Sequence, residues 1–122
     1  MKKLTIVLAL LIFSSPAWGK DVTIKQILEL YDKASPKGKH KYHERFMAWE
    51  TGMSWSNAYQ KHKGGKPLYC LPDNLVMSGE QAFQIFRAEV KRKGEKATLQ
   101  ISGASGMHLL EGLMRTFPCK WT

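Results

Sequence analysis

Two cysteines are the residues of this chain best suited to covalent chemistry. Cys70 lies in the stretch "PLYCLPDN" and Cys119 in "RTFPCKWT", and the sequence holds no other cysteine. A pair of thiols can form a disulfide, contribute to a zinc site or supply a nucleophile. Zinc would need two more ligands at workable spacing, and a nucleophilic thiol would be vulnerable to oxidation after export. The compartment of the protein therefore decides among the three.

The first residues predict export. A positive start, Met1 to Lys3, precedes the apolar run Leu4–Phe13, and the small residues Ala17 and Gly19 then fit the two key positions of a cleavage site before Lys20. This is the pattern of a secretory signal peptide. The apolar run is well short of the roughly 20 residues that a membrane-spanning helix needs. An uncleaved anchor or a core helix is the competing interpretation.

We therefore expect a signal peptide over residues 1–19 and a single soluble domain over residues 20–122, delivered to the periplasm. In an oxidising compartment two thiols of a small domain usually pair, so export favours a disulfide between Cys70 and Cys119. Closing a loop of about 50 residues in this way stabilises a fold by roughly 4 kcal/mol.

The histidines raise the possibility of an enzyme or a metal site. His40 and His43 are three residues apart with Glu44 adjacent, which is a spacing seen in metal and acid–base pairs. They follow a lysine-rich stretch, however, where solvated histidines are the ordinary outcome. His62 lies beside a glycine loop, and His108 is expected at the edge of an apolar helix face. Because no Ser/His/Asp or Cys/His arrangement and no phosphate loop is evident, we expect no enzyme, no metal and no cofactor.

Charge indicates the kind of partner. The chain has 19 Lys and Arg against 10 Asp and Glu, a formal net charge of +9. Inside a cell this balance would suggest nucleic acid. Outside the cytoplasm, acidic proteins, anionic lipid head groups or wall polymers are the fitting partners, and a solvated basic surface is the plainer explanation. We expect no nucleic-acid partner and no membrane insertion once the signal is removed.

The spacing of apolar residues predicts two helices before the first cysteine. Thr23 and Gln26 form a capping-box pair at the start of the first helix, and Ser35-Pro36 ends it. A basic segment over residues 37–41 is expected to be mobile. The second helix covers residues 42–62, and its Gly52 predicts a close approach of another helix. The apolar positions of the two helices are Ile24, Ile27, Leu28, Tyr31, Tyr42, Phe46, Trp49 and Met53.

Two more helices are predicted between the cysteines. The third begins at a capping box formed by Ser78 and Gln81 and ends in "KRKG", with cations and a glycine suited to a helix C-terminus. Residues 97–101 are expected to form a loop, because a single strand there would lack a partner. The last helix covers about residues 104–116. The side chains expected to face the core are Ala82, Phe83, Ile85, Phe86, Val90, Leu109, Leu110, Leu113, Met114 and Phe117.

These elements predict an all-α fold, a small single-domain bundle of about four helices stapled by one disulfide. The bond would tie the entrance of the third helix to the exit of the fourth, as two antiparallel helices allow. Trp49, Met53, Trp55 and Tyr59 are expected to form core and dimer surface rather than a ligand pocket.

The two cysteine motifs also carry a family resemblance. Tyr69-Cys70-Leu71-Pro72, followed by a helix, and the closing Phe117-Pro118-Cys119 are similar to the Rap/Tai family of type VI secretion immunity proteins. Trp49 and Gly52 match a further segment of the family. With the signal peptide, the resemblance covers nearly the whole chain.

The chain departs from the family pattern in two respects. Many members carry a second cysteine pair, at positions that correspond here to about Tyr31 and Phe46, where we expect aromatic packing in its place. Gly112 stands where the family often has alanine, and it is expected to weaken the last helix slightly.

The resemblance implies a periplasmic protein, commonly a dimer, that binds a toxin delivered by neighbouring cells, often a peptidoglycan amidase. Inhibition would be steric occlusion of the toxin's active-site groove. We place the toxin-facing surface on the third helix and the loop after it. The residues expected to form that surface are Glu89, Lys91, Arg92, Lys93, Glu95 and Lys96.

Other readings of the same residues remain open. The charged segment at the end of the third helix is also typical of a solvated helix terminus with no partner. A small, basic, helical protein with one disulfide also fits a periplasmic chaperone or an inhibitor of a foreign cell-wall hydrolase. An immunity protein can also be an orphan that protects only against the toxins of other strains.

Overall fold

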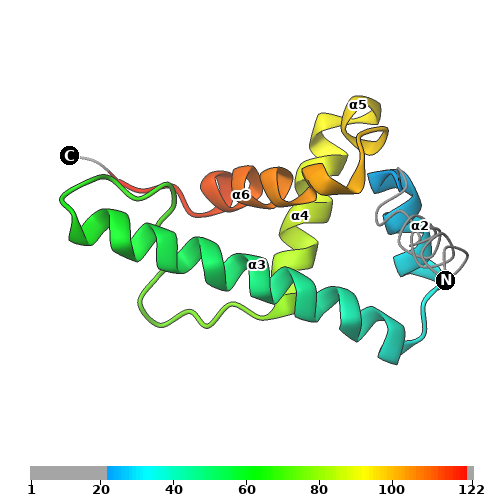
Figure 1. Cartoon of the computed structure of the whole chain (residues 1–122), viewed down its shortest axis with the longest axis horizontal. Helices are drawn as coiled ribbons and strands as arrows, with labels where there is room; N and C mark the ends of the chain where they lie inside the picture. The colour runs from blue at the N-terminus through cyan, green and yellow to red at the C-terminus, as the bar shows by residue number, and fades with distance from the viewer. Residues whose placement is uncertain (1–21, 121–122) are drawn as a thin grey trace, which may run out of the picture.

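The computed structural model describes residues 22–120, which form an all-α domain (Figure 1). The elements are α2 (Ile24–Lys33), α3 (Pro36–His62), α4 (Gly79–Lys93), α5 (Glu95–Thr98), the 3-10 turn η1 (Ser102–Ala104) and α6 (Ser105–Thr116). The expected signal peptide and its cleavage site lie outside the described residues. Within the described part, no helix is both long enough and apolar enough to cross a membrane.

The predicted caps of α2 and α4 are confirmed. Thr23 Oγ1 accepts a hydrogen bond from the backbone N–H of Gln26 at 3.2 Å, and the Gln26 side chain accepts one from the N–H of Thr23 at 2.9 Å. Ser78 and Gln81 repeat this reciprocal pair at the start of α4. Gly94 caps the other end of α4 with φ of 83°, a conformation that favours glycine. Local sequence therefore sets both ends of α4.

The prediction of a mobile segment over residues 37–41 is wrong, because these residues form the first turns of α3. Ser35 caps this helix by accepting a hydrogen bond from the N–H of Gly38 at 3.1 Å, and Pro36 is its first residue. Proline ends a helix that precedes it but fits the first position of a helix that follows. Ser35-Pro36 therefore ends α2 and begins α3 with almost no connection between them.

The segment over residues 97–101 is not simply a loop. Its first residues belong to α5, and Ile101 pairs with Thr23 in an isolated antiparallel bridge. Next to this bridge the N–H of Ser102 donates to the carbonyl of Val22 at 2.7 Å. The partner that the sequence did not reveal is thus the short extended segment before α2.

An aromatic cluster forms one half of the core. Phe83 and Phe86 of α4 are fully buried. The ring of Tyr31 stacks on Phe83 at 4.0 Å between centroids, and the ring of Phe46 lies edge-on to it at 5.0 Å. The aromatic packing expected at Tyr31 and Phe46 is therefore present, with Phe83 between them.

Leucines of α6 complete the core beside the aromatic cluster. Leu109 and Leu113 are fully buried together with Val90 of α4. The expectation for Met114 is wrong, because its side chain is 39 % exposed. The stripe of α6 that faces the core is therefore narrower than predicted, because the last of its four predicted positions is partly exposed to solvent.

Close contacts between helices occur at Gly79 and Gly112 rather than at Gly52. A Cβ on Gly79 would overlap the carbonyl oxygen of His43, and one on Gly112 would lie 2.8 Å from Cγ2 of Ile85. A Cβ on Gly52 would meet no atom within 4 Å, so the predicted close approach there is wrong. The expectation that Gly112 slightly weakens the last helix stays a prediction, and the structure shows in addition that Gly112 allows α6 to pack closely on α4.

The disulfide between Cys70 and Cys119 is present, with a Cα–Cα distance of 5.0 Å. It does not join two antiparallel helices, because α4 runs across α6 (Figure 1). Instead it ties the extended segment before α4 to the segment after α6, where the N–H of Cys70 also donates to the carbonyl of Phe117 at 2.8 Å. The two segments form one clamp at the end of the domain.

Candidate functional site

The structure divides the residues that were expected to face a partner. Glu89 is only 3 % exposed, so its assignment to a protruding surface is wrong. It lies on the side of α4 that packs against α6, four residues after Ile85, which contacts Gly112. Lys91, Glu95 and Lys96 are exposed, and their role in partner binding stays a prediction.

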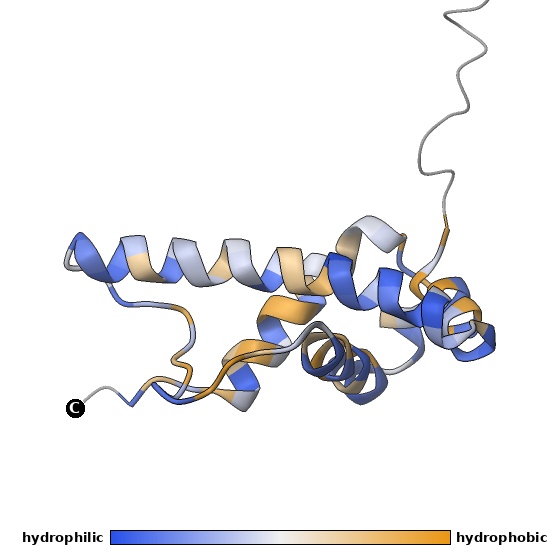
Figure 2. Ribbon diagram, turned by 90° about the horizontal axis from the view of Figure 1, so that it is seen from below, coloured by the Kyte–Doolittle hydropathy of each residue, from blue (hydrophilic) through white to orange (hydrophobic). Residues whose placement is uncertain are grey.

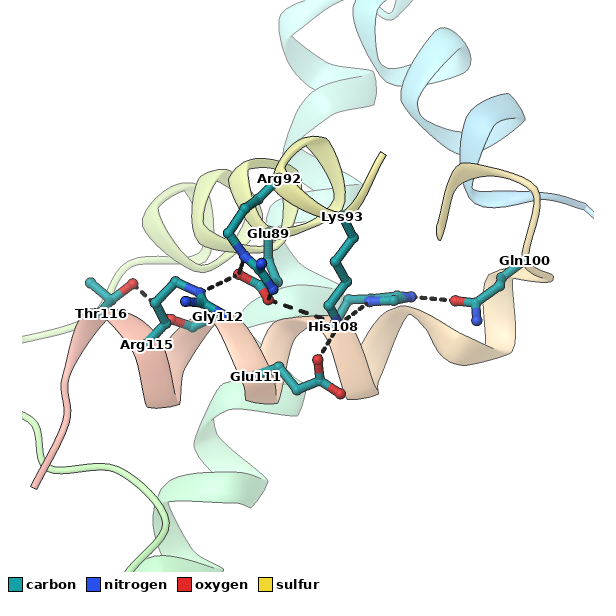
Figure 3. Close-up of polar contacts among 9 residues, drawn as sticks. All are labelled: Glu89, Arg92, Lys93, Gln100, His108, Glu111, Gly112, Arg115 and Thr116. Carbon is teal, nitrogen blue, oxygen red and sulfur yellow. Dashed lines mark hydrogen bonds and ion pairs between the residues drawn. The ribbon is translucent and has the colours of Figure 1, made fainter. Parts of the chain in front are cut away.

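Glu89 is the centre of a group of charges between α4 and α6, which we call the α4–α6 joint (Figure 3). The joint consists of Glu89, Arg92, Lys93, Gln100, His108, Glu111 and Arg115. Arg92 donates to both carboxylate oxygens of Glu89, at 2.7 and 3.2 Å, and Arg115 of α6 donates at 3.0 Å. These bonds, that from Arg92 above all, outweigh burial and lower the pKa of Glu89 to about 2. The buried carboxylate is therefore ionised at any physiological pH.

His108 is the second buried polar group of the joint, at 4 % exposed. Its Nδ1 lies 2.9 Å from the Nζ of Lys93, which can only donate, so Nδ1 is the acceptor. Nε2 then carries the proton and donates to the side-chain oxygen of Gln100. Burial, followed by the charge of Lys93, lowers the pKa of His108. His108, which was expected at the edge of an apolar helix face, is thus a neutral imidazole held inside the domain.

Lys93 links the two buried groups. Its Nζ forms an ion pair with Glu111 of α6 and lies 3.9 Å from Glu89. Since Arg92 and Lys93 both bind groups within the joint, the basic end of α4 is in part internal framework. The joint is therefore a fixed electrostatic connection between α4 and α6.

The other histidines do not form a shared site. His40 pairs with Glu44 at 3.1 Å on an exposed face, whereas Nε2 of His43 lies 2.7 Å from the hydroxyl of Tyr31. Burial raises the pKa of Tyr31, so this hydroxyl remains protonated and can donate to the imidazole. Within residues 22–120, no group of three or more His, Cys, Asp and Glu residues is placed to hold a metal ion.

A groove lies between the C-terminal half of α3 and the start of α6, and we call it the α3–α6 groove. It has a volume of about 710 Å³. The residues that line it are Ala48, Trp49, Gly52, Met53, Ser56, Asn57, Gln60, Leu68, Tyr69, Gly103, Gly106 and Leu110. Trp55 and Tyr59 of α3 are not among the residues that line the groove, and they are 73 % and 64 % exposed. These two aromatic residues are therefore surface and not core.

Sequence reasoning did not find the α3–α6 groove, although α3 contains a signal for it. Ala48, Gly52 and Ser56 are small residues at four-residue spacing, so they share one face of the helix. In Figure 2, α3 is the long helix at the top, blue to white with separate orange segments, and no continuous apolar stripe reveals which face is covered.

The motif around the first cysteine is fixed against α3. Tyr69 is 2 % exposed, and its carbonyl accepts a hydrogen bond from the side chain of Asn57 at 3.0 Å. The other end of that amide accepts from the N–H of Leu68 at 2.9 Å. Asn57 thereby positions the clamp at one end of the α3–α6 groove.

Comparison of the chain with family models, with curated proteins and with solved structures finds no match. The Rap/Tai resemblance therefore rests on the motifs within the chain itself, and above all on the two that meet in the clamp.

Proposed function

We propose that this chain is a periplasmic immunity protein, which binds and occludes an effector of a type VI secretion system, a peptidoglycan amidase. It would protect the producing cell and its kin by covering the active site of that toxin. The observation that carries the proposal is the clamp. The motifs Tyr69–Pro72 and Phe117–Cys119, which carry the family resemblance, form one structural unit through a disulfide and the hydrogen bond from Cys70 to Phe117.

The disulfide also supports the location. Bonds of this kind persist in oxidising compartments and are rare in the cytosol. Together with the signal-peptide pattern of residues 1–19, it favours the periplasm, where a toxin that cleaves peptidoglycan would act.

A rigid framework supports inhibition by occlusion. The domain is held by the aromatic cluster around Phe83, by the α4–α6 joint and by the clamp. Preorganised inhibitors change little on binding and lose little conformational entropy. Removal of Lys2 and Lys3 with the signal peptide leaves 17 Lys and Arg against 10 Asp and Glu, and this net charge of +7 would in addition speed encounter with a partner of negative potential.

The test is capture of the partner from the protein's own strain. A C-terminal affinity tag on the full chain, exported by its own signal, allows partners to be identified by mass spectrometry. We expect one stoichiometric partner with a hydrolase sequence. Periplasmic expression of that hydrolase should then lyse cells that lack this protein and spare cells that make it.

Two results would contradict the proposal. A spread of unrelated unfolded clients would indicate a chaperone. A captured hydrolase whose toxicity is unchanged by this protein would exclude immunity. If the capture is empty, the protection assay is run against amidase effectors of other strains, and failure against all of them counts against the proposal as well.

A further inference from the structure

A second recess lies in the angle between α2 and the first turns of α3, at the end of the domain away from the clamp (Figure 1), and we call it the α2–α3 pocket. Its volume of about 390 Å³ is near the lower end of the range for sites that bind small molecules. On each helix its residues are spaced three or four apart, so each helix presents one face to the pocket. The lining residues are Leu30, Ala34, Gly38, Lys41, Tyr42 and Arg45.

One side of the α2–α3 pocket is apolar. Leu30 of α2 is 56 % exposed, although it is a large aliphatic side chain. Ala34 follows the end of α2, and a Cβ on Gly38 would lie 3.1 Å from the Cβ of Ala34, so the two helices meet there. The ring of Tyr42 is edge-on to Tyr31 of the aromatic cluster, at 5.6 Å between centroids. The core therefore fixes this apolar wall, while Leu30 remains uncovered.

The other side of the pocket is basic. Lys41 and Arg45 are four residues apart on α3, so their side chains are neighbours on the helix surface. Arg87, Arg92 and Arg115 each bind a carboxylate, and Arg45 is the only arginine of the described residues that does not. Lys41 likewise forms no ion pair with another residue between 22 and 120. Two adjacent cations thus lie beside the apolar wall.

The carboxylates near the pocket are bound elsewhere. Within the described part of the chain, none of them lines the pocket. Glu44, next to Arg45 in the sequence, pairs with His40 at 3.1 Å. Asp32 of α2 binds Arg87 at 2.6 Å. The charge of the pocket is therefore complementary to an anion that comes from outside the domain.

We propose that the α2–α3 pocket binds the free carboxyl end of a peptide whose last side chain is apolar. The carboxylate pairs with Lys41 and Arg45, and the side chain packs on Leu30 and Ala34. The last residue of a peptide carries both groups on one Cα, so both enter one small pocket. Within an extended chain, neighbouring side chains point to opposite sides instead. This site goes beyond the proposed immunity function and does not depend on it.

Other sites and ligands fit this chemistry less well. Arg92 and Lys93 at the end of α4 already bind Glu89 and Glu111, and a further carboxylate would have to compete with them. A fatty acid also joins a carboxylate to an apolar group. Its long acyl chain would extend beyond a pocket of about 390 Å³ and leave apolar surface in water.

The test is an NMR titration of the isotope-labelled exported protein, with its disulfide formed, with the dipeptide N-acetyl-alanyl-leucine. We expect saturable shifts of the backbone amides around the pocket, in α2 and the first turns of α3. The C-terminal amide of the same dipeptide lacks only the charge and should bind about tenfold more weakly. N-acetyl-alanyl-serine keeps the charge but loses the apolar side chain, and it should bind about fivefold more weakly.

Matched variants test the two sides of the pocket. Lys41→Gln and Arg45→Gln should each weaken binding about fivefold, whereas Lys61→Gln, which removes the same charge near the other end of α3, should leave it about unchanged. Leu30→Ala should weaken binding about threefold. Leu99→Ala is its control, because Leu99 is 58 % exposed and lies outside the pocket. All five positions are exposed, and melting temperatures close to that of the wild type show that the variants fold.

Several results would overturn the proposal. Shifts that do not saturate, or that lie elsewhere on the domain, would do so. So would equal binding of the acid and its amide, or losses in the control variants as large as those in the pocket variants. Tighter binding of octanoate than of the dipeptide would assign the pocket to a fatty acid. Binding to phosphatidylglycerol vesicles that depends on Leu30 and Arg45, with no dipeptide bound, would assign it to a membrane surface.

Discussion

Helix α6 presents two different surfaces to its neighbours, one at the α4–α6 joint and one at the α3–α6 groove. Toward α4, Gly112 lets the helices meet closely, and Glu89 and His108 are buried with all their polar partners from the domain itself. Toward α3, Gly106 faces open space. The same residue type therefore closes one interface and leaves the other open. The difference is whether atoms of the neighbouring helix lie close to the position that a Cβ would occupy.

In these two regions a charged residue is buried and two aromatic residues are exposed, which is the opposite of their usual distribution. The joint contains charges that look like a solvated helix end in the sequence, yet Glu89 is nearly inaccessible. Helix α3 carries Trp55 and Tyr59, aromatic residues of a kind expected in a core, but both are largely exposed. If this contrast is correct, substitutions in the joint should change stability strongly, and substitutions in the groove should change it little.

The largest effect is expected for Glu89→Gln. The side chain keeps its shape, but Arg92 and Arg115 lose a buried charge partner, and removal of one member of a buried pair is strongly destabilising. Because both arginines are about half exposed and can turn to water, we expect a loss of about 3 kcal/mol rather than the upper end of the range. Urea unfolding followed by circular dichroism, with the disulfide intact, measures it.

Glu44→Gln is the matched control for that measurement. Glu44 pairs with His40 on an exposed face, and such surface pairs contribute about 0–1 kcal/mol. Equal losses in the two variants would mean that Glu89 is not buried in a functioning joint.

Acid should weaken the same joint. Below pH 6.5 the unfolded chain protonates His108, whereas in the folded protein burial lowers the pKa of His108, so that the imidazole takes up its proton only at a lower pH. Below pH 4.5 the unfolded chain protonates Glu89, whose pKa in the folded protein is about 2. In both windows the unfolded state binds more protons, so the free energy of unfolding falls as pH falls.

The contribution of Glu89 to this loss is about 3 kcal/mol between pH 4.5 and about 2. Four charged groups surround these two residues. Arg92 and Arg115 bind Glu89, Lys93 binds His108, and Glu111 pairs with Lys93, while Gln100, the other partner of His108, has no titratable group. Urea titrations at a series of pH values should show a steep decline in the wild type and a shallower one in Glu89→Gln. Parallel declines would show that other groups control the acid response.

Gly112→Ala should have the next largest effect. The new methyl group would lie 2.8 Å from Cγ2 of Ile85 and 3.1 Å from its carbonyl oxygen, so α6 must move away from α4. Overpacking of this kind costs about 1–3 kcal/mol, which exceeds the gain in helix propensity of about 1 kcal/mol. The measurement is the thermal unfolding midpoint. An unchanged or higher midpoint would mean that the two helices are not in close contact at this position.

The sequence predicted the parts of this fold that depend on neighbouring residues. The capping pairs at Thr23 and Ser78 and the glycine that ends α4 are local signals, and all three were found. The disulfide was predicted from the number of cysteines and the expected compartment, neither of which requires knowledge of the fold. The helix order and the all-α class followed from the same spacing rules.

What the sequence did not reveal depends on how helices meet. Gly52 and Gly112 look alike in the sequence, and only the crossing of α4 with α6 shows that the second is the one in contact. Glu89 belongs to a charged run, and it is buried because α6 packs against its side of α4 and brings Arg115, 26 residues later in the chain, to its carboxylate. The α3–α6 groove likewise requires η1 and α6 to lie beside α3.

The smallest effect, and one of opposite sign, is expected for Gly52→Ala. Position 52 is in the middle of α3, and a Cβ there meets no atom within 4 Å. Alanine therefore gains helix propensity without any clash, and stability should rise by about 0.5–1 kcal/mol. Thermal unfolding beside Gly112→Ala measures the contrast directly, since the two variants make the same chemical change. If Gly52→Ala also destabilises the protein, the space beside Gly52 is not open, and the two glycines do not differ in the way that their surroundings indicate.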